Sequence, residues 1–275
     1  MKLRARFSRS AGQGNDRKFG AFNGVFVPTV LTILGVIMYL RLGWVVGNAG
    51  LVGAILIILM AHVVTVTTGL AVSSISTNIR VGAGGAFPLI SQSLGLEVGG
   101  SVSVPLYLAQ GISIALYILG FSAGILNIFP DWPEIAVVLG TFVIILAIAY
   151  VSAQFASRVQ LLILAIVALS LFSILMGSLA VDGRPGMNVT PTLWGDFANG
   201  DFWTVFAIFF PAVTGIMVGI SMSGELRDPR KSIPLGTMSA IAITLVIYLL
   251  LAVWLSRMAA VDELLNIDAG NIVMA

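Results

Sequence analysis

Seven long apolar stretches, separated by short polar segments, dominate the pattern of hydrophobic and polar positions along the chain. A helix that crosses about 30 Å of hydrocarbon needs roughly 20 mostly apolar residues, and each stretch is long enough. Runs such as Val143–Ala149 lack the alternation of a membrane β-strand. The pattern therefore predicts an all-α membrane protein with about seven transmembrane helices, at residues 24–48, 51–75, 98–126, 134–153, 158–180, 202–224 and 234–256.

The composition excludes several classes of function. Apolar residues make up 58% of the 275 residues and charged residues only 9%, against roughly a quarter in an ordinary soluble domain. A soluble enzyme, a nucleic-acid-binding protein and a disordered protein are therefore excluded, because charged side chains would have to cover their surface. The chain has no cysteine and a single histidine, His62. We expect no enzyme activity, no catalytic residue, no cofactor and no metal beyond a transported alkali cation.

The distribution of basic residues predicts the orientation of the spans. With a cytosolic N-terminus, eleven of the fourteen Lys and Arg residues fall on the cytosolic side, as the positive-inside rule requires. Residues 1–19 are then a basic cytosolic tail, and an odd number of spans leaves residues 257–275 outside. The expected location is the cell membrane, as a multi-pass protein in the lipid bilayer.

Two of the seven spans carry residues that interrupt a helix. Each has a proline, a threonine and a glycine near its middle: Pro28, Thr32 and Gly35 in the first span, and Pro211, Thr214 and Gly215 in the sixth. Proline removes a helical hydrogen bond and glycine lowers helix propensity. A proline kink or close packing of small residues is one explanation. The other is an inverted repeat, in which the broken first helices of two halves meet at a central binding site.

The residues around these breaks resemble a known transporter family. Gly24–Gly50 (GVFVPTVLTILGVIMYLRLGWVVGNAG) is similar to the first span of the cation-chloride cotransporters, and Phe209–Gly236 (FFPAVTGIMVGISMSGELRDPRKSIPLG) is similar to their sixth span and the following loop. Gly84–Gly100 and Ala115–Phe121 resemble the family's re-entrant loop and third span. The wider group is the amino acid–polyamine–organocation superfamily. The resemblance covers most of residues 20–256 and implies the LeuT-like inverted-repeat transporter fold.

The resemblance also implies a function and a set of site residues. The expected function is symport of chloride with potassium and/or sodium by alternating access. The residues that match the family's cation site are Thr32, Ile33, Tyr117, Pro211 and Thr214. The residues that match its chloride sites are Gly35, Val36 and Ile37 for one ion, and Gly215, Ile216 and Met217 for the other. Oxygen ligands suit an alkali cation, and amides at a helix start suit an anion.

The sequence departs from the family's pattern in ways that leave alternatives open. Thr32 stands where the family usually has asparagine, and the family's sodium site needs an eighth span. We expect an incomplete transporter domain at 20–256, with the first repeat at about 20–180 and the start of the second at about 202–256. An amino-acid permease on the same scaffold and a non-transporting truncated remnant stay open. The partners are small inorganic ions and lipid, and a homodimer is an open oligomeric state.

Two further polar residues lie in apolar spans. The alternative to a ligand role for Tyr117 is a structural hydrogen bond to a neighbouring helix, because a phenol within a membrane needs a partner. We expect His62 to bond a backbone carbonyl or to lie beside Thr65, with a proton relay as the alternative.

Overall fold

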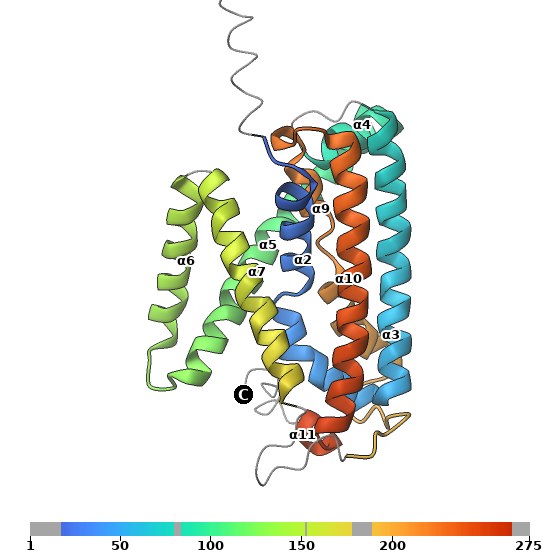
Figure 1. Cartoon of the computed structure of the whole chain (residues 1–275), viewed down its shortest axis with the longest axis vertical. Coiled ribbons are helices and arrows are strands. Elements are labelled where there is room, and N and C mark those ends of the chain that lie inside the picture. Colours follow the sequence, from blue (N-terminus) through green and yellow to red (C-terminus); the bar gives the residue numbers. More distant parts are fainter. Residues whose placement is uncertain (1–17, 80–83, 152, 178–188, 266–275) are drawn as a thin grey trace, which may run out of the picture.

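The computed structural model describes residues 18–79, 84–151, 153–177 and 189–265. Within these ranges every regular element is helical, and one isolated β-bridge joins Phe19 to Leu226. Figure 1 shows the helices standing side by side as a bundle, with α6 at its outer edge. The larger elements are α2 (Val27–Ile33), α3 (Val36–Asn78), α4 (Ala86–Leu94), α5 (Leu96–Ile128), α6 (Glu134–Val151), α7 (Ala153–Met176), α8 (Phe202–Phe209) and α10 (Pro229–Met258).

Five helical stretches in the described part of the chain are long and apolar enough to cross a membrane, and a shorter apolar helix covers Glu134–Tyr150. The first stretch, Phe22–Asn78, has 57 residues, and a straight helix of that length would be about 86 Å long. It reverses at Gly50, whose φ of 69° lies outside the helical region, so the chain descends and then rises in Figure 1. This stretch therefore supplies the first two predicted spans. The remaining five overlap α5, α6, α7, the stretch Phe202–Ser221 and α10.

The reversal at Gly50 is held by the segment that leads into α8. The amide of Leu51 donates to the carbonyl of Thr192 at 2.9 Å, and the amide of Gly195 donates to the carbonyl of Ala49 at 2.9 Å. The buried side chain of Asn48 accepts from the amide of Asn199 at 3.1 Å. The first span (residues 22–50) is called the first rod and the sixth (residues 202–225) the sixth rod. The end of the first rod and the beginning of the sixth are thus joined at one end of the bundle.

The opposite end is closed by the β-bridge. The amide of Phe19 donates to the carbonyl of Glu225 at 2.8 Å, and the amide of Arg227 donates to the carbonyl of Phe19 at 2.9 Å. Since the first rod begins here and the sixth ends here, the two rods run in opposite directions.

The main core lies where α8 and α10 pack against α2 and against the two parts of α3 on either side of Gly50. Met38, Leu42, Ile57, Phe209 and Tyr248 are among its fully buried side chains. The outer helices differ: α7 has large exposed apolar residues such as Leu169 and Phe172. Apolar side chains are suited to contact with lipid. The helix that carries them satisfies its own backbone polar groups, as a lipid environment requires.

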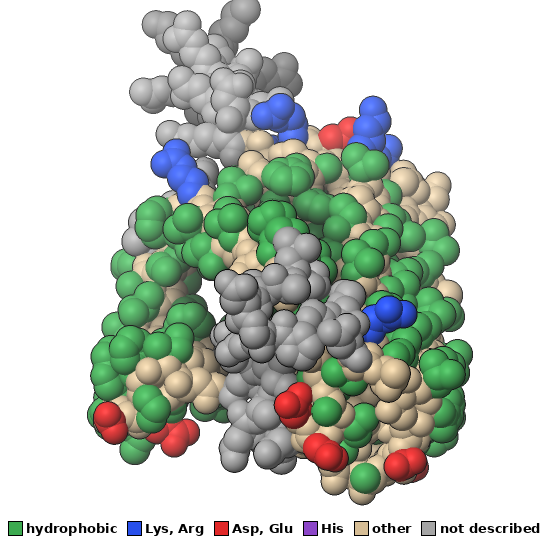
Figure 2. Space-filling model, turned by 60° about the horizontal axis from the view of Figure 1, so that its bottom comes forward, with side chains coloured by type: hydrophobic (Ala, Val, Ile, Leu, Met, Phe, Trp, Pro, Cys, Tyr) green, Lys and Arg blue, Asp and Glu red, His purple; other side chains and the backbone are tan. Residues whose placement is uncertain are grey.

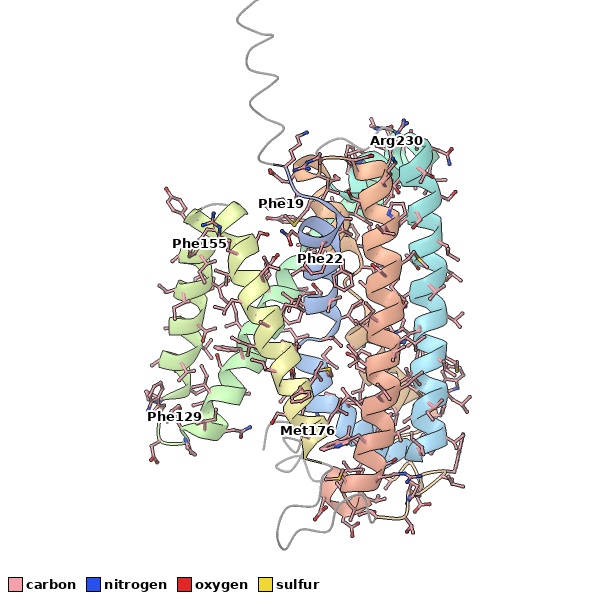
Figure 3. The ribbon with its side chains drawn as sticks, viewed as in Figure 1. Phe19, Phe22, Phe129, Phe155, Met176 and Arg230 are labelled. Atoms are coloured by element: carbon pink, nitrogen blue, oxygen red, sulfur yellow. The ribbon has the colours of Figure 1, made fainter. Side chains whose placement is uncertain are left out.

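Charged side chains are segregated between the two ends of the bundle. Figure 2 shows most Lys and Arg side chains at one end and most Asp and Glu side chains at the other. Figure 3 places Arg230 at the same end as Phe19 and Phe155, with Phe129 and Met176 at the opposite end. The Phe19 end is therefore the basic end.

Candidate functional site

The first rod is interrupted between α2 and α3. Leu34 has φ −83° and ψ 40°, and Gly35 is extended with φ −89° and ψ −159°. Pro28 lies at the start of α2, directly after the π-helical turn η1 (Phe22–Phe26), and the backbone is helical on both sides of it. The break lies at Leu34 and Gly35, so the glycine of the predicted group of proline, threonine and glycine is at the interruption.

The sixth rod is interrupted between η2 (Phe210–Val213) and α9 (Met217–Ser221). Thr214 is extended, and Gly215 has a φ of 99°, a conformation that glycine adopts without the steric cost of a side chain. Pro211 is the second residue of η2, which continues directly from α8. Both rods are therefore discontinuous, and this decides against the explanation by simple proline kinks.

The two breaks contact each other. A Cβ at Gly215 would overlap the Cγ2 methyl of Thr32, and a Cβ at Gly219 would lie 3.0 Å from Oγ1 of Thr29. The glycines of the sixth rod thus let its backbone approach α2 closely. Thr32 and Gly215, assigned from sequence to the cation and chloride sites respectively, are direct neighbours.

α5 covers the first break from another side. The ring carbon Cε1 of Tyr117 lies 3.4 Å from the position of a Cβ at Gly35, and a Cβ at Gly120 would overlap Val36. Tyr117, on the third predicted span, is therefore brought to the residues expected to bind chloride and a cation. The structure brings Thr32, Gly35, Tyr117 and Gly215 into one neighbourhood.

Two hydroxyl groups expected to bind a cation already have protein partners. The hydroxyl of Thr32 donates to the carbonyl of Pro28 at 2.7 Å, and the hydroxyl of Thr214 donates to the carbonyl of Pro211 at 2.7 Å. A donating hydroxyl keeps oxygen lone pairs that accept. The Pro211 carbonyl also accepts from the Thr214 amide at 3.3 Å, so it would have to share or release a bond to bind a cation.

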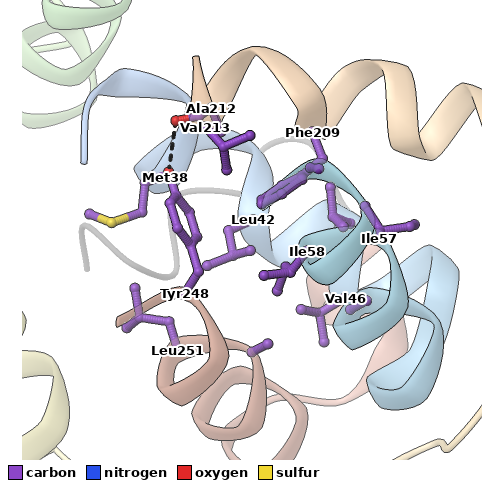
Figure 4. Packing of buried hydrophobic residues seen from close by; sticks show 14 of the residues in the cluster. Met38, Leu42, Val46, Ile57, Ile58, Phe209, Ala212, Val213, Tyr248 and Leu251 are labelled. Atoms are coloured by element: carbon purple, nitrogen blue, oxygen red, sulfur yellow. Dashed lines mark hydrogen bonds between the residues drawn. The ribbon is translucent and has the colours of Figure 1, made fainter. Parts of the chain in front are cut away.

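One residue at the breaks was missed by the sequence reasoning. The buried phenol of Tyr248, on α10, donates to the carbonyl of Ile33 at 2.7 Å and lies 3.4 Å from the carbonyl of Ala212. Figure 4 shows its hydroxyl reaching past Met38 to the residues of η2. A tyrosine in an otherwise apolar span is the signal that singled out Tyr117, and it applied equally here.

The ring of His62 lies next to the ring of Tyr248. Its Nδ1 donates to the carbonyl of Ile58 at 2.9 Å, and the hydroxyl of Thr65 donates to the carbonyl of His62 at 3.1 Å. The expected bond to a backbone carbonyl is therefore confirmed. The ring centroids of His62 and Tyr248 are 6.1 Å apart.

The residues expected to bind chloride lie where helices restart. Gly35 precedes α3, which Val36 and Ile37 begin, and Gly215, Ile216 and Met217 lead into α9. The first amides of a helix have no acceptor in the preceding turn of that helix, and the helix dipole adds a partial positive charge there. The described residues also contain no group of three or more His, Asp or Glu side chains that could hold a metal ion.

Comparison with known proteins identifies the family. Residues 24–274 match the sequence family described as amino acid permease. The chain belongs to the amino acid permease family. It is also 36% identical over 254 residues to solute carrier family 12 member 2 of Danio rerio, which spans 86% of this chain and 22% of that protein. It is 36% identical over 271 residues to human solute carrier family 12 member 1, covering 91% of this chain and 25% of that protein.

These relatives confirm the resemblance to the cation-chloride cotransporters. This member of the permease family is thus an integral multi-pass membrane protein related to transporters, and its family is not one of enzymes. The chain spans about a quarter of the length of the relatives it matches. Their transported substrates and mechanism are accordingly proposals for this chain.

Proposed function

We propose that the chain is a secondary transporter that moves chloride together with potassium and/or sodium by alternating access. The observation that carries the proposal is the meeting of two antiparallel broken helices at Thr32 and Gly215. Freed carbonyls and helix starts at such a junction are suited to a cation and an anion respectively. The relatives in solute carrier family 12 favour inorganic ions as the cargo.

The proposed cation ligands are the backbone around Thr32 and Ile33, the phenol of Tyr117, and Pro211 with Thr214. One chloride ion would bind the amides of Gly35, Val36 and Ile37, and the second those of Gly215, Ile216 and Met217. Loading a cation and an anion together leaves little net charge, which lowers the cost of enclosing them away from water. The LeuT-like inverted repeat, a cytosolic Phe19 end and a location in the cell membrane belong to the same proposal.

Uptake into proteoliposomes tests this function. The full chain is reconstituted, and rubidium uptake is measured with chloride or gluconate as the anion. Symport predicts uptake that needs chloride and fails with gluconate. Equal uptake with both anions would contradict coupling to chloride.

The second candidate is an amino-acid permease, which the description of the matching family favours. The same breaks would then bind a carboxylate at the helix starts and an amino group at the freed carbonyls. Uptake of labelled amino acids into the same proteoliposomes separates the two candidates. Amino-acid uptake without chloride-dependent rubidium uptake would replace the cotransporter proposal. Uptake of neither would support a non-transporting remnant.

A further inference from the structure

We propose that Tyr248 takes the place of the cation at the Ile33 carbonyl. Its hydroxyl donates a hydrogen bond to that carbonyl when no cation is bound there. The inference rests on the proposed function, because the Ile33 carbonyl is one of the groups assigned there to the cation. It extends that function by giving α10 a part in the return of the unloaded transporter.

The geometry places one hydroxyl between two freed carbonyls. Tyr248 is fully buried, and its Oη lies 2.7 Å from the carbonyl oxygen of Ile33 and 3.4 Å from that of Ala212. Ile33 is the last residue of α2, and Ala212 lies in η2 just before the second break. A phenol has one hydroxyl hydrogen, so it donates a good hydrogen bond to one carbonyl at a time. Here that carbonyl is the one of Ile33.

The ring of Tyr248 is held so that its hydroxyl stays at this junction. It meets the ring of Phe209 edge-on, with centroids 5.3 Å apart and an interplanar angle of 84°. The ring of His62 packs nearby, and that histidine is anchored to the Ile58 carbonyl. With the ring fixed, rotation of the hydroxyl hydrogen towards Ala212 is the movement that frees the Ile33 carbonyl.

A symporter needs such a group because it must return without its cargo. A carbonyl freed by a helix break is costly to bury without a partner. A bound cation removes that cost in the loaded transporter, and the Tyr248 hydrogen removes it in the unloaded one. The positive hydrogen and a cation would repel each other at the same oxygen, so binding of one favours departure of the other.

Tyr248→Phe tests the inference by removing the hydrogen and keeping the ring. The unloaded state loses its partner for Ile33, while the loaded state loses only the weaker approach to Ala212. We expect the half-saturating rubidium concentration to fall about tenfold, equivalent to about 1.4 kcal/mol. Net rubidium uptake should slow, because it requires the unloaded return step. Exchange of internal potassium for external rubidium, which bypasses that step, should continue at the wild-type rate.

Two control variants separate this role from packing. Tyr107→Phe removes the same hydroxyl from a side chain that is 77% exposed, and it should leave net uptake, exchange and affinity unchanged. Phe209→Leu disturbs the packing of the Tyr248 ring but keeps its hydroxyl. It should lower the melting temperature equally with and without potassium chloride, without a gain in affinity.

Thermal unfolding of the purified chain gives a readout that does not depend on transport. Potassium chloride is compared with N-methyl-D-glucamine chloride, and potassium should raise the melting temperature more in Tyr248→Phe than in wild type. An equal or smaller rise, or parallel losses of net uptake and exchange, overturns the inference while the proposed function stands. A wild-type chain that shows neither a potassium-dependent rise nor rubidium uptake overturns the cation site and this inference with it.

Discussion

Gly215 lies directly against the side chain of Thr32, so that a Cβ on the glycine would overlap the threonine methyl group and lie 3.0 Å from the Thr32 Cβ. The two residues come from the interrupted parts of two antiparallel rods. Their contact shows that the two interrupted segments pack closely against each other. Gly215 is also held at a φ of 99°, so both its shape and its conformation require glycine.

Gly215→Ala should therefore impair both folding and transport. A side chain at this φ costs about 1–3 kcal/mol, and the overlap with Thr32 adds to that cost. We expect a lower melting temperature and a loss of most rubidium uptake. Adding Thr32→Ser removes the overlapping methyl group and should restore part of the stability, while the backbone strain remains.

Gly111→Ala is the matched control, because a Cβ there meets nothing within 4 Å. Alanine is favoured over glycine in a helix by about 1 kcal/mol, so this variant should be as stable as wild type or more so. If Gly215→Ala behaves like Gly111→Ala, close contact between the breaks is not required.

Tyr117→Phe and Thr214→Ala should each weaken the binding of the cation. Each removes an oxygen proposed as a ligand, and a bond to a charged partner contributes about 1.5–3 kcal/mol. We expect the half-saturating rubidium concentration to rise about tenfold or more. The amount of protein in the membrane should not change.

Thr67→Ala is the control for Thr214→Ala. Its exposed hydroxyl bonds only the carbonyls of Val63 and Val64 in its own helix, as the Thr214 hydroxyl bonds that of Pro211. Wild-type rubidium affinity in both Tyr117→Phe and Thr214→Ala would remove the site assignment.

Substitutions at Gly35 should show a graded effect of size. Its φ is negative, so the restriction here is space: a Cβ would lie 3.1 Å from the Thr32 carbonyl oxygen and 3.4 Å from the Tyr117 ring. We expect Gly35→Ala to reduce the apparent chloride affinity modestly and Gly35→Leu to abolish chloride-dependent uptake. The measurement is rubidium uptake at increasing chloride concentrations. A leucine variant with wild-type chloride dependence would place the anion elsewhere.

The start of α8 should make stability depend on pH. The carboxylate of Asp201 accepts from the amide of Thr204 at 2.9 Å and from the Thr204 hydroxyl, and these bonds lower the pKa of Asp201 from its ordinary value of 3.8. A lowered pKa adds stability above 3.8 that is lost as pH falls through the folded-state pKa. Asp201→Ala should therefore melt below wild type at pH 7, and the difference should shrink in acid.

Thr204→Val tests the cause of this shift. It removes the hydroxyl donor and keeps the amide donor, so its effect at pH 7 should be smaller than that of Asp201→Ala. A difference between wild type and Asp201→Ala that stays constant from pH 7 to acid would show that the carboxylate charge does not contribute.

Much of the architecture could be predicted from local sequence. The spans follow from the lengths of the apolar runs, and the reversal at Gly50 falls between the first two. The prolines were less informative about the breaks. The backbone stays helical through Pro28 and Pro211. α10 starts at Pro229, before the predicted residue 234.

The sequence by itself determined the apolar helices, the separation of basic from acidic ends and the glycines at which two spans break, because length, charge and backbone freedom are local properties. Only the tertiary structure decided that Thr32 meets Gly215, that the Tyr117 ring covers Gly35, and that Tyr248 bonds the Ile33 carbonyl. Those two bonded residues are 215 positions apart. No local pattern specifies which distant donor will reach a carbonyl freed by a break, because that depends on how all the rods pack.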